Sequence, residues 1–151
     1  MSPIAKHIDL GQRGEEFALA YLLQLGFRIV GTNFAIPVGR NRVGTSIVAE
    51  IDIVAYDGDV LCFVEVKTRA SAWFAGPEAN VDLRKRRQIA RAARAYRRMF
   101  GLEKARCRFD VITLVIPEDL RPSISPEIRL LKNYWREDQL KKRAWSDRYY
   151  D

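Results

Sequence analysis

Two apolar runs on either side of the dipeptide Asp57-Gly58 constrain the fold of this chain more than any other feature. The runs cover residues 47–56 and 60–69 and are rich in β-branched residues, which favour strands, while Asp-Gly is a common hairpin turn. The sequence therefore predicts an antiparallel hairpin. Four charged residues interrupt its two strands: Glu50, Asp52, Glu65 and Lys67.

Side-chain alternation is expected to place these four charges on one face of the sheet. A two-residue turn at Asp57-Gly58 sets Glu50 opposite Glu65, with β-carbons about 5 Å apart, and makes Asp52 a diagonal neighbour at about 7 Å. A three-residue turn would reverse the parity, so the arrangement depends on the register of the hairpin.

Carboxylates at such distances repel one another unless a cation lies between them. Two or three carboxylate oxygens suit a hard ion such as Mg²⁺ or Mn²⁺. Such an ion lowers the pKa of its bound water and offsets charge on a phosphodiester transition state. Lys67, about 6 to 7 Å along the strand from Glu65, is placed to position or activate the attacking water. We interpret the four charges as a metal-assisted phosphodiesterase site.

The rest of the chain predicts one α/β domain with appendages. Residues 36–46 are expected to form a loop or a protruding hairpin, and residues 1–116 to make up the domain. Residues 117–151 are expected to form a proline-rich linker and a partly helical extension. The expected elements are a helix at 11–25, strands from residue 27, at 47–56 and at 60–69, a helix at 81–100 and a strand at 107–116. Their order, α-β-β-β-α-β, predicts a mixed sheet flanked by helices.

The net charge of +7 is concentrated in the second predicted helix. Eight of the 26 basic residues and none of the 19 acidic ones lie between Arg84 and Arg98, so the rest of the chain is nearly balanced. This pattern favours a phosphate-binding face with salt-dependent, largely sequence-independent affinity over a solvated helix surface. The expected nucleic-acid-binding residues are Arg84, Lys85, Arg87, Arg91, Arg94 and Arg98, with Arg69 on the preceding strand.

Several classes of protein are disfavoured by residues that the chain uses sparingly. Its two cysteines lie far apart, which fits neither a disulfide framework nor a zinc site, and its one histidine lies near the N-terminus. No apolar run approaches the roughly 20 residues of a membrane span, and the N-terminus lacks a signal-peptide pattern. We expect a cytoplasmic protein without a membrane partner.

The spacing of Asp52, Glu65 and Lys67 resembles the Asp…Glu-x-Lys core of restriction-endonuclease-like nucleases, a class that includes archaeal Holliday-junction resolvases. More closely, the segments "GQRGEEFALAYLLQLGF", "EIDIVAYDG", "FVEVKTR" and "RFDVI" resemble the YraN family of bacterial proteins over roughly residues 11–116. The resemblance implies a restriction-endonuclease-like fold, nucleic-acid binding and a Mg²⁺-dependent nuclease centre.

The resemblance also implies roles for single residues. Glu15 matches a helical glutamate that helps to bind the metal or its water in resolvase-like relatives. Asp52 matches the metal-bridging aspartate, Glu65 the second ligand and Lys67 the catalytic lysine. Glu50 matches the glutamate of a Gly-Glu-Ile-Asp motif, although Ala49 replaces the glycine.

Other positions of the family pattern are matched less fully. Arg69 and Asp110 match positions to which we give supporting roles only. Between Asn33 and Glu50 the chain is longer than the family pattern, and this insertion carries Arg40 and Arg42.

Other interpretations of the same residues remain open. Glu15 alone fits the preference for acidic residues near a helix N-terminus, and Glu50 fits an ion-pair partner of Lys67. The chain as a whole fits a non-catalytic nucleic-acid-binding protein that retains the fold, or an interaction module whose aromatic tail recruits a partner. The expected substrate is DNA rather than RNA, with branched DNA among the candidates, and a homodimer is expected by analogy with resolvases. The tail aromatics are Tyr134, Trp135, Trp145, Tyr149 and Tyr150.

Overall fold

The structure, a computed structural model, describes residues 3–70, 81–117 and 125–140. It confirms the predicted α/β class and the α-β-β-β-α-β order, to which a further strand is added. The elements are α1 (Pro3–Gln24), β1 (Arg28–Arg40), β2 (Ser46–Asp57), β3 (Val60–Arg69), α2 (Leu83–Met99), β4 (Cys107–Val115), β5 (Glu127–Trp135) and the 3₁₀ turn η2 (Glu137–Leu140).

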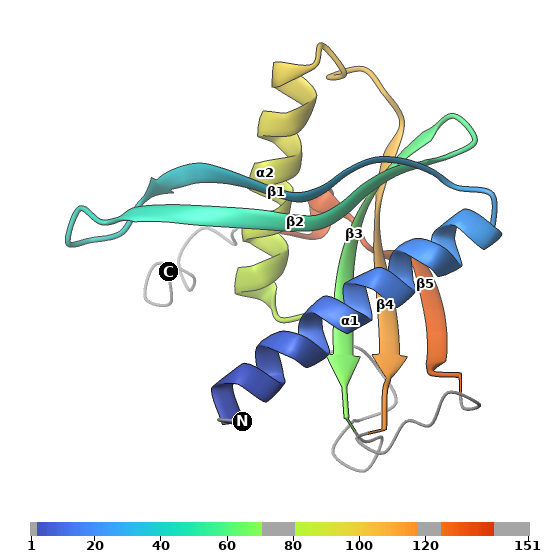
Figure 1. Cartoon of the computed structure of the whole chain (residues 1–151). Helices are drawn as coiled ribbons and strands as arrows, with labels where there is room; N and C mark the ends of the chain where they lie inside the picture. The colour runs from blue at the N-terminus through green and yellow to red at the C-terminus, as the bar shows by residue number, and fades with distance from the viewer. Residues whose placement is uncertain (1–2, 71–80, 118–124, 141–151) are drawn as a thin grey trace.

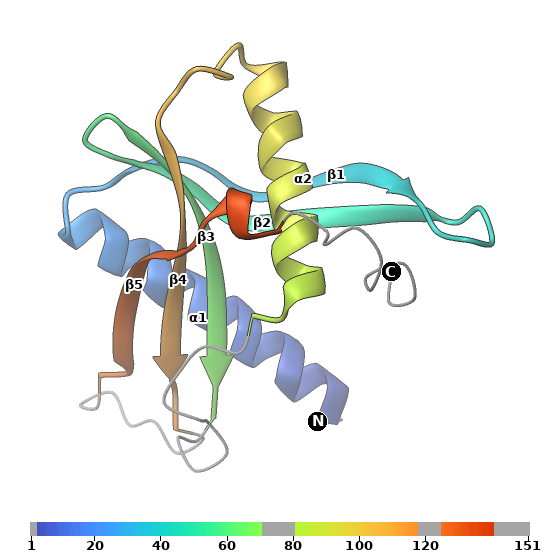
Figure 2. The same ribbon diagram turned by 180° about the vertical axis from the view of Figure 1, so that it is seen from behind.

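The five strands form one mixed sheet in the order β1-β2-β3-β4-β5. Of the four strand pairs among the described residues, only β3 and β4 pair in parallel, and α2 forms part of the connection between these two strands. Helix α1 covers one face of the sheet and α2 the other, as the two opposite views show (Figures 1 and 2). Each helix closes its own apolar core, with Leu22 and Val64 on the α1 side and Ile89 and Phe63 on the α2 side.

Both predicted helices form: α2 lies within one or two residues of its predicted bounds, whereas α1 begins eight residues before the predicted start at Gly11. In α2, Asp82 caps the N-terminus by accepting a hydrogen bond from Lys85 N at 2.8 Å. The buried residues Ile89 and Tyr96 follow at helical spacing, whereas Met99 is 62% exposed because the helix ends there. Among the residues that the structure describes, neither helix combines the length and the apolar character needed to cross a bilayer.

The hairpin between β2 and β3 differs from its prediction by one step. Its two turn residues are Gly58 and Asp59, not Asp57 and Gly58, so Asp57 pairs with Val60 and Ile53 with Val64. The reason is that Gly58 adopts a φ of 60°, and a type II′ turn takes glycine at its first central position. The parity of the two strands is unchanged, but every predicted partner moves by two residues.

The C-terminal segment is a strand where the sequence predicted partly helical structure. β5 pairs antiparallel with β4 and extends the sheet beyond residue 116. Its apolar pattern is irregular because the register shifts between Phe109 and Val111, where Asn133 adopts a φ of 52°. Trp135 is buried and stacks on Phe109 at 4.9 Å between ring centroids, so this aromatic residue docks on the core. The remaining predicted tail aromatics, from Trp145 onward, lie outside the described residues.

The insertion between β1 and β2 takes the second of its two predicted forms, a protruding hairpin. β1 and β2 pair as far as Arg40 and Ser46, and their far end projects past α2 and away from the rest of the sheet (Figure 1). Ile36 and Val38 still pack against the α2-side core, whereas residues 39–46 are all exposed.

Candidate metal centre

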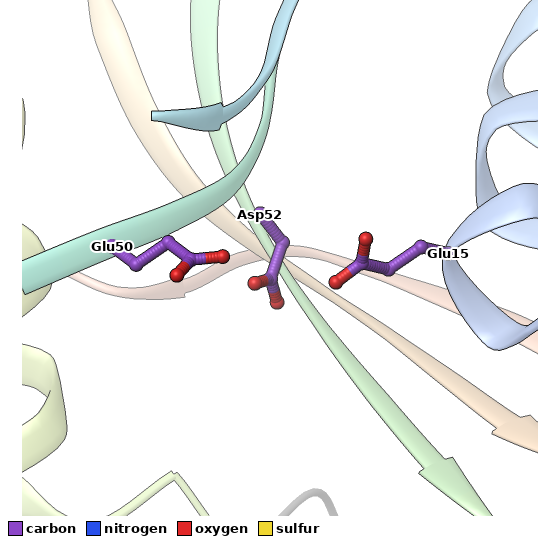
Figure 3. A group of neighbouring side chains, drawn as sticks. All are labelled: Glu15, Glu50 and Asp52. Atoms are coloured by element: carbon purple, nitrogen blue, oxygen red, sulfur yellow. The ribbon is translucent and has the colours of Figure 1, made fainter. Parts of the chain in front are cut away.

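Three carboxylates from two elements converge beside the sheet. Glu15 comes from α1, and Glu50 and Asp52 come from β2 (Figure 3). One oxygen from each lies within 4.8 Å of the others, and Asp52 sits between the two glutamates. Cation–oxygen distances of about 2.1 to 2.5 Å place two ligands of one ion roughly 3 to 5 Å apart, so oxygens at this spacing could share one hard cation.

Close packing of α1 on β3 brings Glu15 to this cluster. A β-carbon on the preceding residue, Gly14, would lie 1.8 Å from Oγ1 of Thr68. Only glycine allows the helix backbone to approach the strand so closely. The next side chain in the helix, Glu15, is thereby held over the sheet beside Asp52.

Asp52 lies where β2 separates from β3. The last described pair between these strands is Ile53 with Val64, and beyond it Val66 N donates a hydrogen bond to Asp52 Oδ2 at 2.8 Å. A side-chain carboxylate thus replaces the backbone partner that Val66 has lost. Ile51 and Val54 both pack in the α2-side core, so regular alternation of β2 is broken at Asp52.

This break shows that the predicted placement of Glu50 opposite Glu65 is wrong. Glu50 pairs with Ala35 of β1. Its neighbours Ala49 and Ile51 both pack on the α2 side, so its own side chain points to the α1 side, toward Glu15. Glu65 forms an ion pair with a residue of α2 and therefore lies on the opposite face. The four charges do not share one face as predicted.

Asn33 connects the two glutamates and was missed by the sequence reasoning. With its amide oriented to donate, its nitrogen lies 3.0 Å from Glu50 Oε1 and 3.2 Å from Glu15 Oε2. Burial and the negative charge of Asp52 raise the pKa of Glu15, and the hydrogen bond from Asn33 opposes this rise. Asn33 adopts a φ of 50° in the middle of β1, and no pattern in the sequence indicates this backbone conformation.

Glu65 is a buried carboxylate next to Asp52. It is 5% exposed, and its Oε2 is buried without a hydrogen-bond partner among the described residues. Lys67 Nζ and Lys85 Nζ lie 3.7 and 3.9 Å from its Oε1, close enough for ion pairs but too far for hydrogen bonds. Burial and the charge of Asp52 raise the pKa of Glu65 to about 7, and the two ammonium groups only partly offset this rise.

Lys85 therefore belongs to the centre as well as to the basic helix. The sequence reasoning assigned it only to the phosphate-binding face. Asp82, three residues before Lys85, caps α2 and so fixes Lys85 in the first turn, from which its side chain reaches Glu65. Glu65, on the α2 side, meets the three-carboxylate cluster at Asp52. The four carboxylates and the two amines together are called the carboxylate centre below: Glu15, Glu50, Asp52, Glu65, Lys67 and Lys85.

The predicted arginine face of α2 is partly covered. Arg94 and Arg97 form ion pairs with Glu137 of η2, the second at 3.2 Å, so an acid distant in sequence compensates part of the basic helix. Arg84 and Arg98 are exposed, as predicted. Between α2 and η2 lies a groove of about 490 Å³ lined by Arg87, Ala90, Arg91, Arg94, Glu137, Asp138 and Leu140.

The two supporting residues lie in different surroundings. Arg69 ends β3, two residues beyond Lys67 on the same strand face, and is half-buried. Asp110 is fully buried, where it accepts hydrogen bonds from Arg108 Nε at 2.9 Å and from Asn133 N at 2.8 Å. Asp110 therefore stabilises the irregular pairing of β4 with β5 and takes no part in the carboxylate cluster.

Comparison with known proteins identifies similar chains over most of this length. A family model described as "Uncharacterised protein family UPF0102" matches residues 14–114, which include every residue of the centre. A UPF0102 protein of Koribacter versatilis is 39% identical over 128 residues, which cover 85% of this chain and 80% of the relative. A second from Geobacter sulfurreducens is 44% identical over 115 residues, 76% of this chain and 82% of the relative. A third from Chlorobium phaeobacteroides strain BS1 is 41% identical over 107 residues, 71% of this chain and 77% of the relative.

Proposed function

This chain belongs to the UPF0102 family, the family also called YraN, and we propose that it is a metal-dependent nuclease that hydrolyses phosphodiester bonds. One observation carries the proposal. Glu15, Glu50 and Asp52, from a helix and a strand, bring carboxylate oxygens within 4.8 Å of one another, beside a buried glutamate and two lysines.

The residues present fit Mg²⁺ or Mn²⁺. All the donors are carboxylate oxygens, which hard cations prefer. Among the described residues, the side-chain amide of Asn33 and the backbone N–H of Val66 donate hydrogen bonds to the cluster, and both donors are neutral. The carboxylate of Glu65 lies next to Asp52, and its buried Oε2 has no ordinary hydrogen-bond donor among the described residues, so it offers a further metal ligand. Glu15, Glu50 and Asp52 would hold the ion, and Glu65 would complete or orient its ligand set.

A bound ion would lower the pKa of its water and offset negative charge on the phosphate. The amines of the chain would act on the same reaction. Lys67, one-third exposed, can orient the attacking water and stabilise charge that develops on the phosphoryl oxygens. Lys85 of α2 lies 3.9 Å from Glu65 Oε1 and would add positive charge near the phosphate of a bound substrate.

The surface charge supports nucleic acid as the substrate class. Exposed arginines of α2, with Arg69 at the end of β3, offer contacts to a phosphate backbone without a module that reads bases. We propose DNA, including branched DNA, as the substrate, with RNA as the alternative to be tested. By analogy with resolvases, which cut two strands symmetrically, we also propose a homodimer, which sedimentation would detect.

Cleavage of labelled single-stranded, duplex and four-way-junction DNA and of RNA, at low salt with Mg²⁺, Mn²⁺ or EDTA, tests the function. We expect metal-dependent cutting that is lost in Asp52→Ala and Lys67→Ala. Asp59→Asn is the matched control, because this carboxylate lies on the same hairpin and is 81% exposed. Salt-sensitive binding without cutting, or equal cutting by all variants, would instead support a non-catalytic nucleic-acid-binding protein.

A further inference from the structure

The projecting end of the β1–β2 hairpin has properties that the carboxylate centre does not use. We name residues 39–48 the arm. The arm consists of the far ends of β1 and β2, which pair as far as Arg40 and Ser46, and the turn between them. Residues 39–46 are all exposed. Figures 1 and 2 show that it extends past α2, away from both apolar cores. The cores of the domain therefore do not explain its length.

The charge of the arm is of one sign. Residues 36–49 contain Arg40 and Arg42 and no acidic residue. Such a segment attracts polyanions and repels the basic surface of α2, so a second copy of this chain is a poorer occupant than nucleic acid.

The tip of the arm has a fixed shape. The side chain of Asn41 accepts hydrogen bonds from Val43 N at 3.1 Å and Thr45 N at 2.9 Å, and Arg40 donates to Gly44 O at 2.8 Å. This ordering leaves Val43 84% exposed at the end of the hairpin, and Val48 is 57% exposed. A preorganised tip loses little entropy when it binds.

We propose that the arm is a second nucleic-acid contact, a two-stranded ribbon that enters a groove of the duplex whose backbone is cut at the carboxylate centre. A two-stranded β-ribbon fits the major groove, where arginines meet phosphates or base edges and an apolar side chain meets thymine methyl groups. The inference rests on the proposed function, because it takes the substrate to be duplex DNA.

The reach of the arm predicts where it touches the substrate. Glu50, at the root, belongs to the carboxylate cluster, and Val43 lies seven residues along the hairpin. At about 3.3 Å per residue the tip is about 23 Å from the centre. A duplex rises about 3.4 Å per base pair, so the contact lies up to about seven base pairs from the cleaved bond.

The test uses full-length Lys67→Ala protein, which is expected to bind without cutting, and a series of duplexes about 6 to 30 base pairs long. The tip variant adds Arg40→Ala, Arg42→Ala and Val43→Ser. The control variant instead adds Arg106→Ala and Arg129→Ala, which remove the same charge elsewhere on the surface.

We expect the tip variant to bind long duplexes at least tenfold more weakly than the control variant. Its plot of log affinity against log salt should be shallower by about 2 if both arginines meet phosphates. The difference should vanish on duplexes of about seven base pairs or fewer, which are too short to reach from the centre to the tip of the arm.

Equal affinity and equal salt dependence of the tip and control variants on every duplex would overturn the inference and leave the nuclease proposal intact. A tip variant that sediments as a monomer where the control is a dimer, and that regains binding at high protein concentration, would also overturn it and assign the arm to a second copy. If protein with an intact arm binds no nucleic acid at all, the nuclease proposal falls and the arm inference falls with it.

Discussion

Replacing Glu65 with glutamine is expected to remove the contribution of this residue to the pH dependence of the free energy of unfolding of the metal-free protein. In the folded chain, burial and the charge of Asp52 raise the pKa of Glu65 from 4.5 to about 7. Below pH 4.5 the residue is protonated in both the folded and unfolded states. Between pH 4.5 and about 7 the unfolded state loses its proton first, so the free energy of unfolding falls as the pH rises.

The full difference between these pKa values corresponds to about 3 kcal/mol, of which roughly 2 to 3 kcal/mol falls between pH 5 and pH 8. Glutamine keeps the shape of the side chain and cannot ionise. In urea denaturation with EDTA, the wild type should therefore lose about 2 to 3 kcal/mol more than Glu65→Gln between these two pH values. With an m-value of about 1 to 3 kcal/mol per molar urea, the denaturation midpoint moves by about 0.7 to 3 M.

The exposed Glu127 supplies a matched control, because Glu127→Gln removes the same group from the surface of β5. This variant should keep the pH dependence of the wild type. Added Mg²⁺ or Mn²⁺ should reduce the loss of stability of the wild type at pH 8, since a cation favours ionised carboxylates. Equal pH dependence of the wild type and Glu65→Gln would refute the account of Glu65 as a buried carboxylate that is poorly neutralised without metal.

Three further predictions concern packing, the buried network and the basic helix. Gly14→Ala should lower the free energy of unfolding by about 1 to 3 kcal/mol in chemical denaturation, because the new β-carbon collides with Thr68. Gly11→Ala is the control: a β-carbon at this position has no atom within 4 Å, so the variant should be as stable as the wild type or more stable. Asp110→Ala should cost about 1.5 to 3 kcal/mol in the same assay, because it removes the buried carboxylate that accepts hydrogen bonds from Arg108 Nε and Asn133 N, while Arg108 keeps its ion pair with Asp57. Glu137→Gln should tighten nucleic-acid binding several-fold at low salt, because it releases Arg94 and Arg97 from their ion pairs. Fluorescence anisotropy measures the affinity, and an unchanged value would show that these arginines do not contact phosphate.

Local sequence patterns predicted most of the fold because the local and tertiary preferences agree. Helix α2 begins at a capping aspartate and carries a regular apolar face, and β3 was predicted with its observed ends, Val60 and Arg69. β5 was missed because its alternation is interrupted where Asn133 takes a left-handed conformation and donates its N–H to the buried Asp110. That interruption depends on a partner 23 residues earlier in the chain, which no local pattern contains.

The candidate site was predicted in composition more accurately than in geometry. The structure brings Glu15, Glu50 and Asp52 together, and the resemblance had already selected all three residues. The direct pairing of Glu50 with Glu65 was wrong, because it assumed regular alternation through Asp52, where β2 in fact leaves β3. Glu15 reaches the cluster only because Gly14 allows α1 to approach Thr68, a contact between distant parts of the chain.

The charge pattern of α2 shows the same limit. Counting charges within residues 84–98 predicted an uncompensated basic face, but acids from other elements pair with it. Glu65 of β3 meets Lys85, and Glu137 of η2 meets Arg94 and Arg97. Composition within one helix therefore indicated the sign of the surface but not which of its cations remain available to a ligand.

Single-turnover cleavage at saturating protein, with binding measured on the same substrate, tests the central proposal most directly. The substrate is the DNA that the wild type cuts fastest with Mg²⁺, and the comparison is with Lys67→Met, which keeps the length of the side chain and removes its charge. We predict a fall of at least 100-fold in the cleavage rate with a dissociation constant changed less than threefold, because Lys67 acts on the reaction more than on binding. Equal single-turnover rates, or no cutting by the wild type with either Mg²⁺ or Mn²⁺, would contradict the proposal that this centre hydrolyses phosphodiesters.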